Sequence, residues 1–238
     1  MKIKRISDAT ARNFKLRLCH VSDTHGKFPR LYGRYDAVIH TGDLFPNSHH
    51  VMSGNKTQEM SYQLQWLRDS LPEMKSWLQG HPFLYVPGNH DFLNSALLEF
   101  ELRSVGIEAF DLTDKMLNFQ GVNFYGFPYV PAINGMWNYE RELPEMQKEV
   151  DRMIGDLNKT YVDVLACHAP PYRMLDLTMG NEIVGCQVIA TALDYKISKD
   201  MLPAYYLCGH IHEANGMSVR NGMMVSNAAT TRHIIEIA

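Results

Sequence analysis

The chain has 238 residues, of which 45% are hydrophobic and 21% are charged, a composition typical of folded globular proteins. Its formal net charge of −3 supplies no global basic field for nucleic acid or an anionic membrane, and no apolar run approaches the ~20 residues of a membrane span. The four cysteines lack Cys-x-x-Cys spacing, which favours free thiols in a reducing, cytoplasmic compartment.

Short apolar segments bounded by turn residues recur along the chain and have the length of β-strands. We expect strands at Leu16–Val21, Ala37–His40, Phe83–Val86, Val122–Tyr125, Val162–Ala166 and Tyr205–Cys208. Near the C-terminus, Asn221-Gly222 predicts a type I′ hairpin between Met217–Arg220 and Met223–Ser226, because that turn needs positive φ at both positions.

Helical patterns lie between these segments. We expect helices over Thr57–Leu71, Ala96–Ser104, Pro144–Leu157 and Cys186–Tyr195. Pro72 should break or restart the first helix, because proline lacks the backbone N–H that a helix interior needs. Alternating strands and helices predict an α/β fold with mixed sheets, and without a repeat or linker to divide it we expect a single domain over residues 1–238.

Polar, glycine-bearing turns follow five of the predicted strands. They read Ser22-Asp23-Thr24-His25-Gly26, Thr41-Gly42-Asp43, Pro87-Gly88-Asn89-His90-Asp91, Cys167-His168-Ala169-Pro170 and Gly209-His210-Ile211-His212. Ligands bind at the carboxyl ends of strands in α/β sheets, so these turns can converge on one crevice. Imidazole and carboxylate groups suit Zn, Mn or Fe, and no thiolate cluster favours a structural zinc site.

The spacing within the turns suggests how ligands are presented. In an extended segment, Asp-x-His and His-x-His place two side chains on the same side, because side chains alternate with period two. Glycine beside a ligand lets backbone approach a metal closely. Two ions ~3.5–4 Å apart, bridged by a carboxylate, would polarise a phosphoryl oxygen and activate a shared water.

The five motifs, in this order, resemble those of the calcineurin-like metallophosphoesterase superfamily. The resemblance implies a four-layer α/β/β/α sandwich of two mixed β-sheets flanked by helices, with two divalent metal ions. The first ion would be held by Asp23, His25 and His212. Asp43 would bridge, and the second ion would be held by Asn89, His168 and His210.

The resemblance also implies catalytic roles for His90 and Asp91, with His90 facing the substrate and Asp91 orienting it. His90 could instead be a further ligand or a packed histidine bonded to Asp91. We favour a general acid or phosphoryl-stabilising role, because an adjacent carboxylate raises the pKa of imidazole and keeps it a donor.

A finer resemblance lies between the motifs. Segment 125–131, Trp137-Asn138-Tyr139 and His168-Ala169-Pro170-Pro171 are similar to the metallophosphoesterase-domain (MPPED-like) subgroup. That subgroup comprises small phosphodiesterases, some acting on cyclic nucleotides such as 2′,3′-cyclic AMP. It implies a phosphodiesterase for a small nucleotide or cyclic-nucleotide-like substrate, acting through a metal-bridging hydroxide. Residues expected to contact the substrate are Arg173, Tyr129 and Trp137, the last either stacking on a base or packing as a rim.

Three alternatives stay open at this point. A phosphomonoesterase would use the same motifs, and so would a nuclease, although a nuclease usually needs a basic groove that the net acidity disfavours. A non-catalytic metal-binding module is the third, yet no expected ligand is missing. The partner we expect is a small phosphoester, without membrane association, and neither the oligomeric state nor a role for residues 45–57 follows from the sequence.

Overall fold

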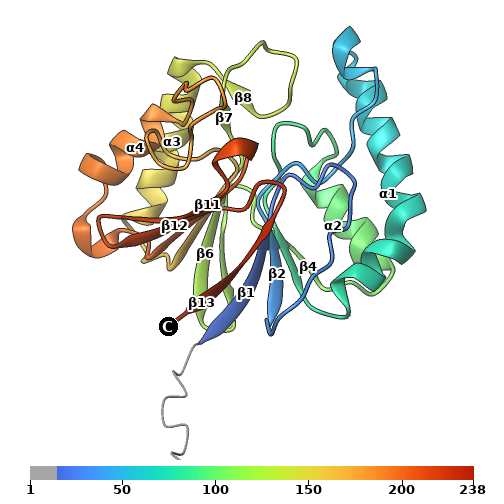
Figure 1. Cartoon of the computed structure of the whole chain (residues 1–238), viewed down its shortest axis with the longest axis horizontal. Helices are drawn as coiled ribbons and strands as arrows, with labels where there is room; N and C mark the ends of the chain where they lie inside the picture. Colours follow the sequence, from blue (N-terminus) through green and yellow to red (C-terminus); the bar gives the residue numbers. More distant parts are fainter. Residues whose placement is uncertain (1–14) are drawn as a thin grey trace, which may run out of the picture.

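The computed structural model describes residues 15–238, in which two β-sheets pack face to face (Figure 1). The first sheet has the order β13-β1-β2-β3-β4, from Arg232–Ile237, Leu16–Val21, Ala37–His40, Phe83–Tyr85 and Ala109–Asp111. The second has the order β11-β12-β10-β9-β6-β5, from Gly216–Arg220, Met223–Asn227, Tyr205–Cys208, Val164–Cys167, Val122–Phe127 and Met116–Phe119. Each sheet mixes parallel and antiparallel pairs. A short pair, β7 (Val130–Pro131) and β8 (Glu140–Arg141), lies outside both sheets.

Helices cover the outer face of each sheet, which completes four layers (Figure 1). Helices α1 (Lys56–Leu78) and α2 (Ser95–Ser104) pack on the first sheet, with Leu67 and Leu102 in the buried layer. Helices α3 (Leu143–Leu157) and α4 (Gln187–Thr191) pack on the second. A third apolar layer fills the space between the sheets. The α/β/β/α sandwich expected from the sequence is therefore confirmed.

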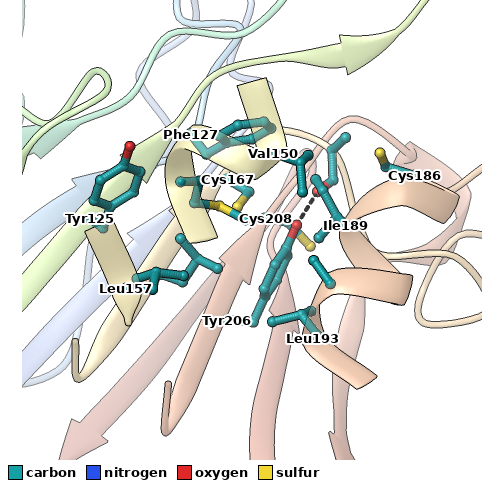
Figure 2. Packing of buried hydrophobic residues seen from close by; sticks show 14 of the residues in the cluster. Tyr125, Phe127, Val150, Leu157, Cys167, Cys186, Ile189, Leu193, Tyr206 and Cys208 are labelled. Carbon is teal, nitrogen blue, oxygen red and sulfur yellow. Dashed lines mark hydrogen bonds between the residues drawn. The ribbon is translucent and has the colours of Figure 1, made fainter. Parts of the chain in front are cut away.

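The layer beneath α3 and α4 consists of aromatic, aliphatic and cysteine side chains (Figure 2). Tyr206 is fully buried there, and its hydroxyl donates to the carbonyl oxygen of Ala169 at 2.7 Å. Since a buried hydroxyl without a partner costs about 1–3 kcal/mol, this bond removes the main penalty of burying a tyrosine. It also ties β10 to the turn that follows His168.

Helix α1 differs from the prediction at Pro72, which lies inside a continuous helix from Lys56 to Leu78. An interior proline costs ~3 kcal/mol, because it removes one helical hydrogen bond. Apolar residues on both sides of it, such as Leu67 and Met74, are fully buried against the first sheet. Burial of that whole face offsets the lost bond, so the helix does not end where the sequence suggested.

The hairpin prediction near the C-terminus is confirmed. Asn221 and Gly222 have φ of 52° and 84°, and they join β11 to β12 in an antiparallel pair. Strand β12 therefore returns beside β10, and the edge strand β13 follows it onto the first sheet. The expected helix over residues 186–195 is shorter, with α4 continuing into a π-helical turn over Ala192–Lys196.

A chain of polar side chains joins the two sheets across the central layer. His20 of β1 contacts the hydroxyl of Thr41 through Nε2 and that of Ser226 of β12 through Nδ1, each at 2.9 Å. The Ser226 hydroxyl also contacts Nδ1 of His233 at 2.8 Å. Burial, reinforced by the nearby His233 and His40, holds the pKa of His20 well below its ordinary value. His20 is therefore neutral in the folded protein.

This burial predicts a specific loss of stability in acid. Below pH 6.5 the unfolded chain binds a proton at His20 that the folded chain does not, so the free energy of unfolding falls as pH decreases, by up to about 1.4 kcal/mol per pH unit. His20→Gln should reduce that slope by about this amount between about pH 6 and pH 5. The measurement is urea unfolding of metal-free protein, with His49→Gln, at a loop histidine, as the control. An unchanged slope in His20→Gln would show that His20 is protonated in the fold.

Candidate metal centre

The turns at five strand ends meet at one edge of the sandwich, as the sequence predicted. Their side chains form three overlapping groups in which the candidate ligand atoms lie within 4.8 Å of one another. The groups are Asp23 with His25 and His212, His25 with Asp43 and His90, and Asp43 with His168 and His210. Asp23, Asp43 and His90 follow strands of the first sheet, whereas His168, His210 and His212 follow strands of the second.

Asp43 lies at the centre of these groups. One oxygen, Oδ2, is 3.3 Å from Nε2 of His168 and 4.0 Å from Nε2 of both His25 and His90. The other, Oδ1, accepts a hydrogen bond from the backbone N–H of His90 at 2.7 Å. Asp43 is thus the carboxylate that two of the three groups share, an arrangement compatible with a bridging ligand.

His168 is held so that one ring nitrogen faces the other donors. Its Nδ1 donates to the carbonyl oxygen of Thr41 at 2.7 Å, which requires a proton on Nδ1. Its Nε2 lies 3.0 Å from Oδ1 of Asn89 and 3.3 Å from Asp43. Second-sphere bonds of this kind orient metal-binding histidines, because they fix both the tautomer and the ring plane.

The backbone of the turns differs from the extended form expected from the Asp-x-His and His-x-His spacing. Asp23, His25, Asp43 and His210 have φ of 54°, 45°, 58° and 70°, in the left-handed region. His212 begins a 3₁₀ turn over His212–Ala214. Residues other than glycine seldom adopt positive φ, at a cost of about 1–3 kcal/mol each, and such strain clusters at functional sites. Turn geometry, rather than strand alternation, therefore aims these side chains at one another.

Glycines in the turns make room for this convergence. A Cβ on Gly88 would lie 2.6 Å from the backbone nitrogen of Asp43 and nearer still to its carboxylate. On Gly209 it would lie 2.6 Å from Cβ of Ser22 and would also strike Asp23. Both distances are below those of real Cβ contacts, so any larger residue displaces a donor.

The charges of these donors are strongly coupled. Burial alone would raise the pKa of both Asp23 and Asp43, but hydrogen bonds and the positive potential of the histidines outweigh it and lower both. For His168, burial opposes protonation, yet the charge of Asp43 and the bond to it raise the pKa to about 9. Burial lowers the pKa of His210 to about 4. Because their pKa values are lowered, Asp23 and Asp43 carry negative charge that a bound cation can balance.

The donor chemistry of the site fits divalent cations. The groups offer carboxylate oxygens, imidazole nitrogens and the amide oxygen of Asn89, a set that Mn, Fe and Zn accept. Two buried carboxylates lie together, which is costly without compensating positive charge. Cations would be held by the seven residues predicted from the sequence, Asp23, His25, Asp43, Asn89, His168, His210 and His212.

His90 lies between two side chains that fix its ring. Trp137 stacks on it with ring centres 3.9 Å apart and 26° between the planes. On its edge, Nδ1 contacts Oδ1 of Asn47. The Asn47 amide cannot be reversed, because its Nδ2 donates to Glu59 at 3.2 Å and to the carbonyl oxygen of His90 at 3.0 Å. Nδ1 of His90 is therefore the donor to Asn47, and Nε2 is left to face Asp43.

Asn47 is a site residue that the sequence analysis did not find. It belongs to residues 45–57, which had no assigned role. Glu59, fully buried on α1, accepts from the backbone N–H of Ser48 at 2.9 Å and from the Ser48 hydroxyl at 2.6 Å. Gln63 of α1 donates to the carbonyl oxygen of His90 at 2.7 Å. Helix α1 thus holds both this loop and the His90 turn in place.

The prediction that Asp91 orients the His90 ring is wrong. Its carboxylate accepts from the backbone N–H groups of Asp43 and Gly88 at 2.8 Å each and of Phe45 at 3.0 Å, not from His90. Burial, with the charge of Asp43, raises the pKa of Asp91 to about 7 despite those bonds. For His90 itself, burial lowers the pKa, contrary to the rise expected from an adjacent carboxylate. Asp91 joins the turns after β2 and β3 rather than orienting the imidazole.

The three residues expected to contact the substrate lie in different surroundings. Tyr129 is buried, its hydroxyl donates to Asp114 at 2.6 Å, and Arg141 covers its ring at 4.3 Å. Arg173 borders an open groove of about 650 Å³ whose lining includes Glu213, the residue after His212, and its backbone N–H donates to Asp176. Trp137 reaches the site, where it packs on His90. Proximity in sequence to a motif misled the prediction for Tyr129, and contact of Arg173 with the substrate stays a prediction.

Within residues 15–238, every helix is too short or too polar to cross a membrane.

Solved structures with this architecture share the fold at low sequence identity. A crystal structure 15% identical in sequence superposes with a TM-score of 0.69, over 93% of this chain and 99% of the other. The crystal structure of TT1561 of Thermus thermophilus is 13% identical and superposes with a TM-score of 0.56, over 93% and 98%. At these identities the likeness concerns the fold alone.

Sequence relatives come from Caenorhabditis elegans. UPF0046 protein K07C11.7 is 25% identical over 231 residues, 90% of this chain and 69% of that protein. UPF0046 protein C25E10.12 is 24% identical over 251 residues, 94% and 78% respectively. UPF0046 protein T07D4.2 is 30% identical over 108 residues, and the match spans only 25% of its length.

The model of one protein family matches most of the chain. It covers residues 16–214, from the first residue of β1 to just beyond His212, and so includes all five strand-end turns. Its description is calcineurin-like phosphoesterase. With this match over more than half of its length, and with the sandwich and donor groups described above, the chain belongs to the calcineurin-like phosphoesterase family.

Proposed function

We propose that the protein is a dinuclear metal-dependent phosphodiesterase that acts on a small nucleotide or cyclic-nucleotide-like substrate. The observation that carries the proposal is the set of three overlapping donor groups, in which His25 and Asp43 are each shared by two groups. Shared donors favour two adjacent ions over a single one. When bound, such ions polarise phosphoryl oxygens and lower the pKa of a coordinated water toward neutrality.

The protein's own residues would position the phosphoester beside these ions. His90 presents Nε2 toward Asp43 while Asn47 holds Nδ1, so any proton exchanged with the substrate passes through Nε2. Trp137 covers one face of the His90 ring and excludes water from it. These contacts support a role for His90 in stabilising the phosphoryl group or protonating the leaving group.

The dimensions of the site favour a small substrate. A cleft of about 300 Å³ adjoins Asp23, His25 and His212, near the lower end of the range for small-molecule pockets. The net charge of −3 disfavours an extended nucleic acid. The preference for a diester over a monoester rests on the resemblance to the MPPED-like subgroup, so a phosphomonoesterase is the second candidate.

A reducing, cytoplasmic compartment suits the cysteines. All four, Cys19, Cys167, Cys186 and Cys208, are buried and free. Burial raises the pKa of Cys19 and Cys186 to about 11, so these thiols are unreactive near neutral pH.

A substrate panel with metal analysis tests the proposed function. Purified protein should contain divalent metal and, with added Mn²⁺, should hydrolyse bis-p-nitrophenyl phosphate and 2′,3′-cyclic AMP, and chelation should abolish both activities. Hydrolysis of monophosphates alone would favour the phosphomonoesterase, and cleavage of DNA would favour a nuclease. Metal-loaded protein that hydrolyses no phosphoester would overturn the enzymatic proposal.

A further inference from the structure

The cleft beside the metal centre has a second wall that the reaction at the donor groups does not use. Its first wall is formed by Asp23, His25 and His212. The rest of its lining includes Lys27 with Thr230 and Thr231. Because His25 and His212 belong to a donor group and also line the cleft, this space adjoins the donors and can receive the remaining atoms of a phosphoester bound there.

Lys27 brings a positive charge without a partner to the cleft. Its side chain is exposed and forms no ion pair or hydrogen bond with any residue from 15 to 238. The one acidic group in the lining, Asp23, is already bonded to His212 and to the backbone N–H of His210. Lys27 also opens segment 27–34, which contains two more cations, Arg30 and Arg34, and no acid. In a protein of net charge −3, this segment of the sequence is locally basic, and Lys27 is its cation in the lining of the cleft.

The threonines add hydroxyl donors on a fixed turn. Thr230 has a φ of 57°, and its N–H donates to the carbonyl oxygen of Ser22 at 3.1 Å. The N–H of Thr231 donates to the carbonyl oxygen of Ala228 at 3.0 Å. These bonds hold the turn between β12 and β13 against β1, while both hydroxyls stay free of hydrogen bonds within the described chain. A lysine ammonium with adjacent hydroxyls is a chemistry that binds phosphate.

We propose that this cleft binds a second, non-reacting phosphate group of the substrate, with Lys27 as the residue that selects for it. The inference rests on the proposed function, because it assumes that a phosphoester reacts at the donor groups. The substrate class then narrows to small nucleotides that carry one phosphate at the metal centre and another on the same molecule. Lys27 acts on substrate choice, and it takes no part in metal binding.

Two substrates that differ only in the second phosphate provide the test. Thymidine 5′-(p-nitrophenyl phosphate) and its 3′-phosphorylated form have the same reacting diester and leaving group. Wild-type protein should show a kcat/KM about tenfold higher for the 3′-phosphorylated substrate, expressed mainly in KM, and the preference should weaken at high salt. Lys27→Met should remove the preference, and Lys27→Arg should restore most of it.

Lys199→Met is the matched control. Lys199 is likewise exposed, and its side chain forms no ion pair or hydrogen bond with the described residues, but it lies on the 3₁₀ turn Lys199–Met201 and does not line the cleft. The Lys199→Met variant should keep the wild-type preference for the 3′-phosphorylated substrate. The proposed subsite would be overturned if the wild-type protein had the same kcat/KM for both substrates. It would also be overturned if Lys27→Met lowered kcat/KM equally for both.

Equilibrium dialysis separates failure of this inference from failure of the proposed function. Thymidine 3′,5′-bisphosphate should bind wild-type protein about tenfold more tightly than thymidine 5′-monophosphate, and Lys27→Met should bind the two equally. If no phosphoester is turned over, the proposed function fails, and dialysis still decides whether the subsite exists. If turnover is normal and dialysis shows no difference, only the subsite is wrong.

Discussion

Asp43→Asn is expected to reduce kcat/KM by at least about 10³-fold and to lower the bound metal below that of the wild type. The amide keeps the size of the side chain but loses the negative charge that Oδ2 presents to His25, His90 and His168. It also weakens the hydrogen bond accepted from the N–H of His90. Because one carboxylate serves two donor groups, its replacement should weaken metal binding at both of these groups.

The measurement is metal content by mass spectrometry beside steady-state hydrolysis of bis-p-nitrophenyl phosphate. Asp36→Asn provides the control, since Asp36 directly precedes the first residue of β2, at the opposite end of the strand from Asp43, and its carboxylate accepts from the N–H of Arg17. The Asp36→Asn variant should retain the metal content and the activity of the wild type. Full metal content in Asp43→Asn would contradict a bridging role.

His90→Ala is expected to lower kcat by about 10²- to 10⁴-fold while most of the metal stays bound. The imidazole lies 4.0 Å from Asp43 and is fixed by Asn47 and Trp137, so its geometry suits a contact with substrate. The check is kcat and metal content on the same preparation. Equal loss of metal and rate would show that His90 is a ligand instead.

A companion variant tests the support of the His90 ring. Asn47→Ala should reduce kcat by a smaller factor, about 10- to 100-fold, with metal content unchanged, because the imidazole remains but loses its fixed tautomer. Asn47→Leu should behave in the same way, since it also removes the acceptor at Nδ1. A wild-type kcat in both variants would show that the contact between Asn47 and His90 serves only to hold the loop.

Local patterns in the sequence predicted the strands and the polar turns that follow them, whereas the four-layer arrangement came from the resemblance to a family. Apolar runs such as Leu16–Val21 and Tyr205–Cys208 have strand length, and both strands are observed with these bounds. The polar turns that follow them combine uncommon residue types with glycine, and parallel strands bring their carboxyl ends to one edge. Asp23 and His212, far apart in the chain, meet because the two sheets stack with these edges together.

The predictions failed where a tertiary contact decides the outcome. Asn47 lies in a loop without periodicity, and its role depends on Glu59 from the next helix. Asp91 stands beside His90 in the sequence, but its side chain turns toward backbone N–H groups of the preceding strand-end turn. Pro72 has a strong local preference that burial of both flanking turns overrides. No alternation or spacing rule contains these contacts.

The division of the donors between two sheets has a mechanical consequence. Asp23, Asp43 and Asn89 follow strands of one sheet, and His168, His210 and His212 follow strands of the other, so the separation of these candidate donors depends on the thickness of the apolar layer between the sheets. Replacing an inner side chain such as Leu207 or Val164 with a smaller one should let the two sheets shift or move closer together, although the substitution is far from any reacting atom. Catalysis in this protein will therefore be sensitive to mutations whose only direct effect is on interlayer spacing.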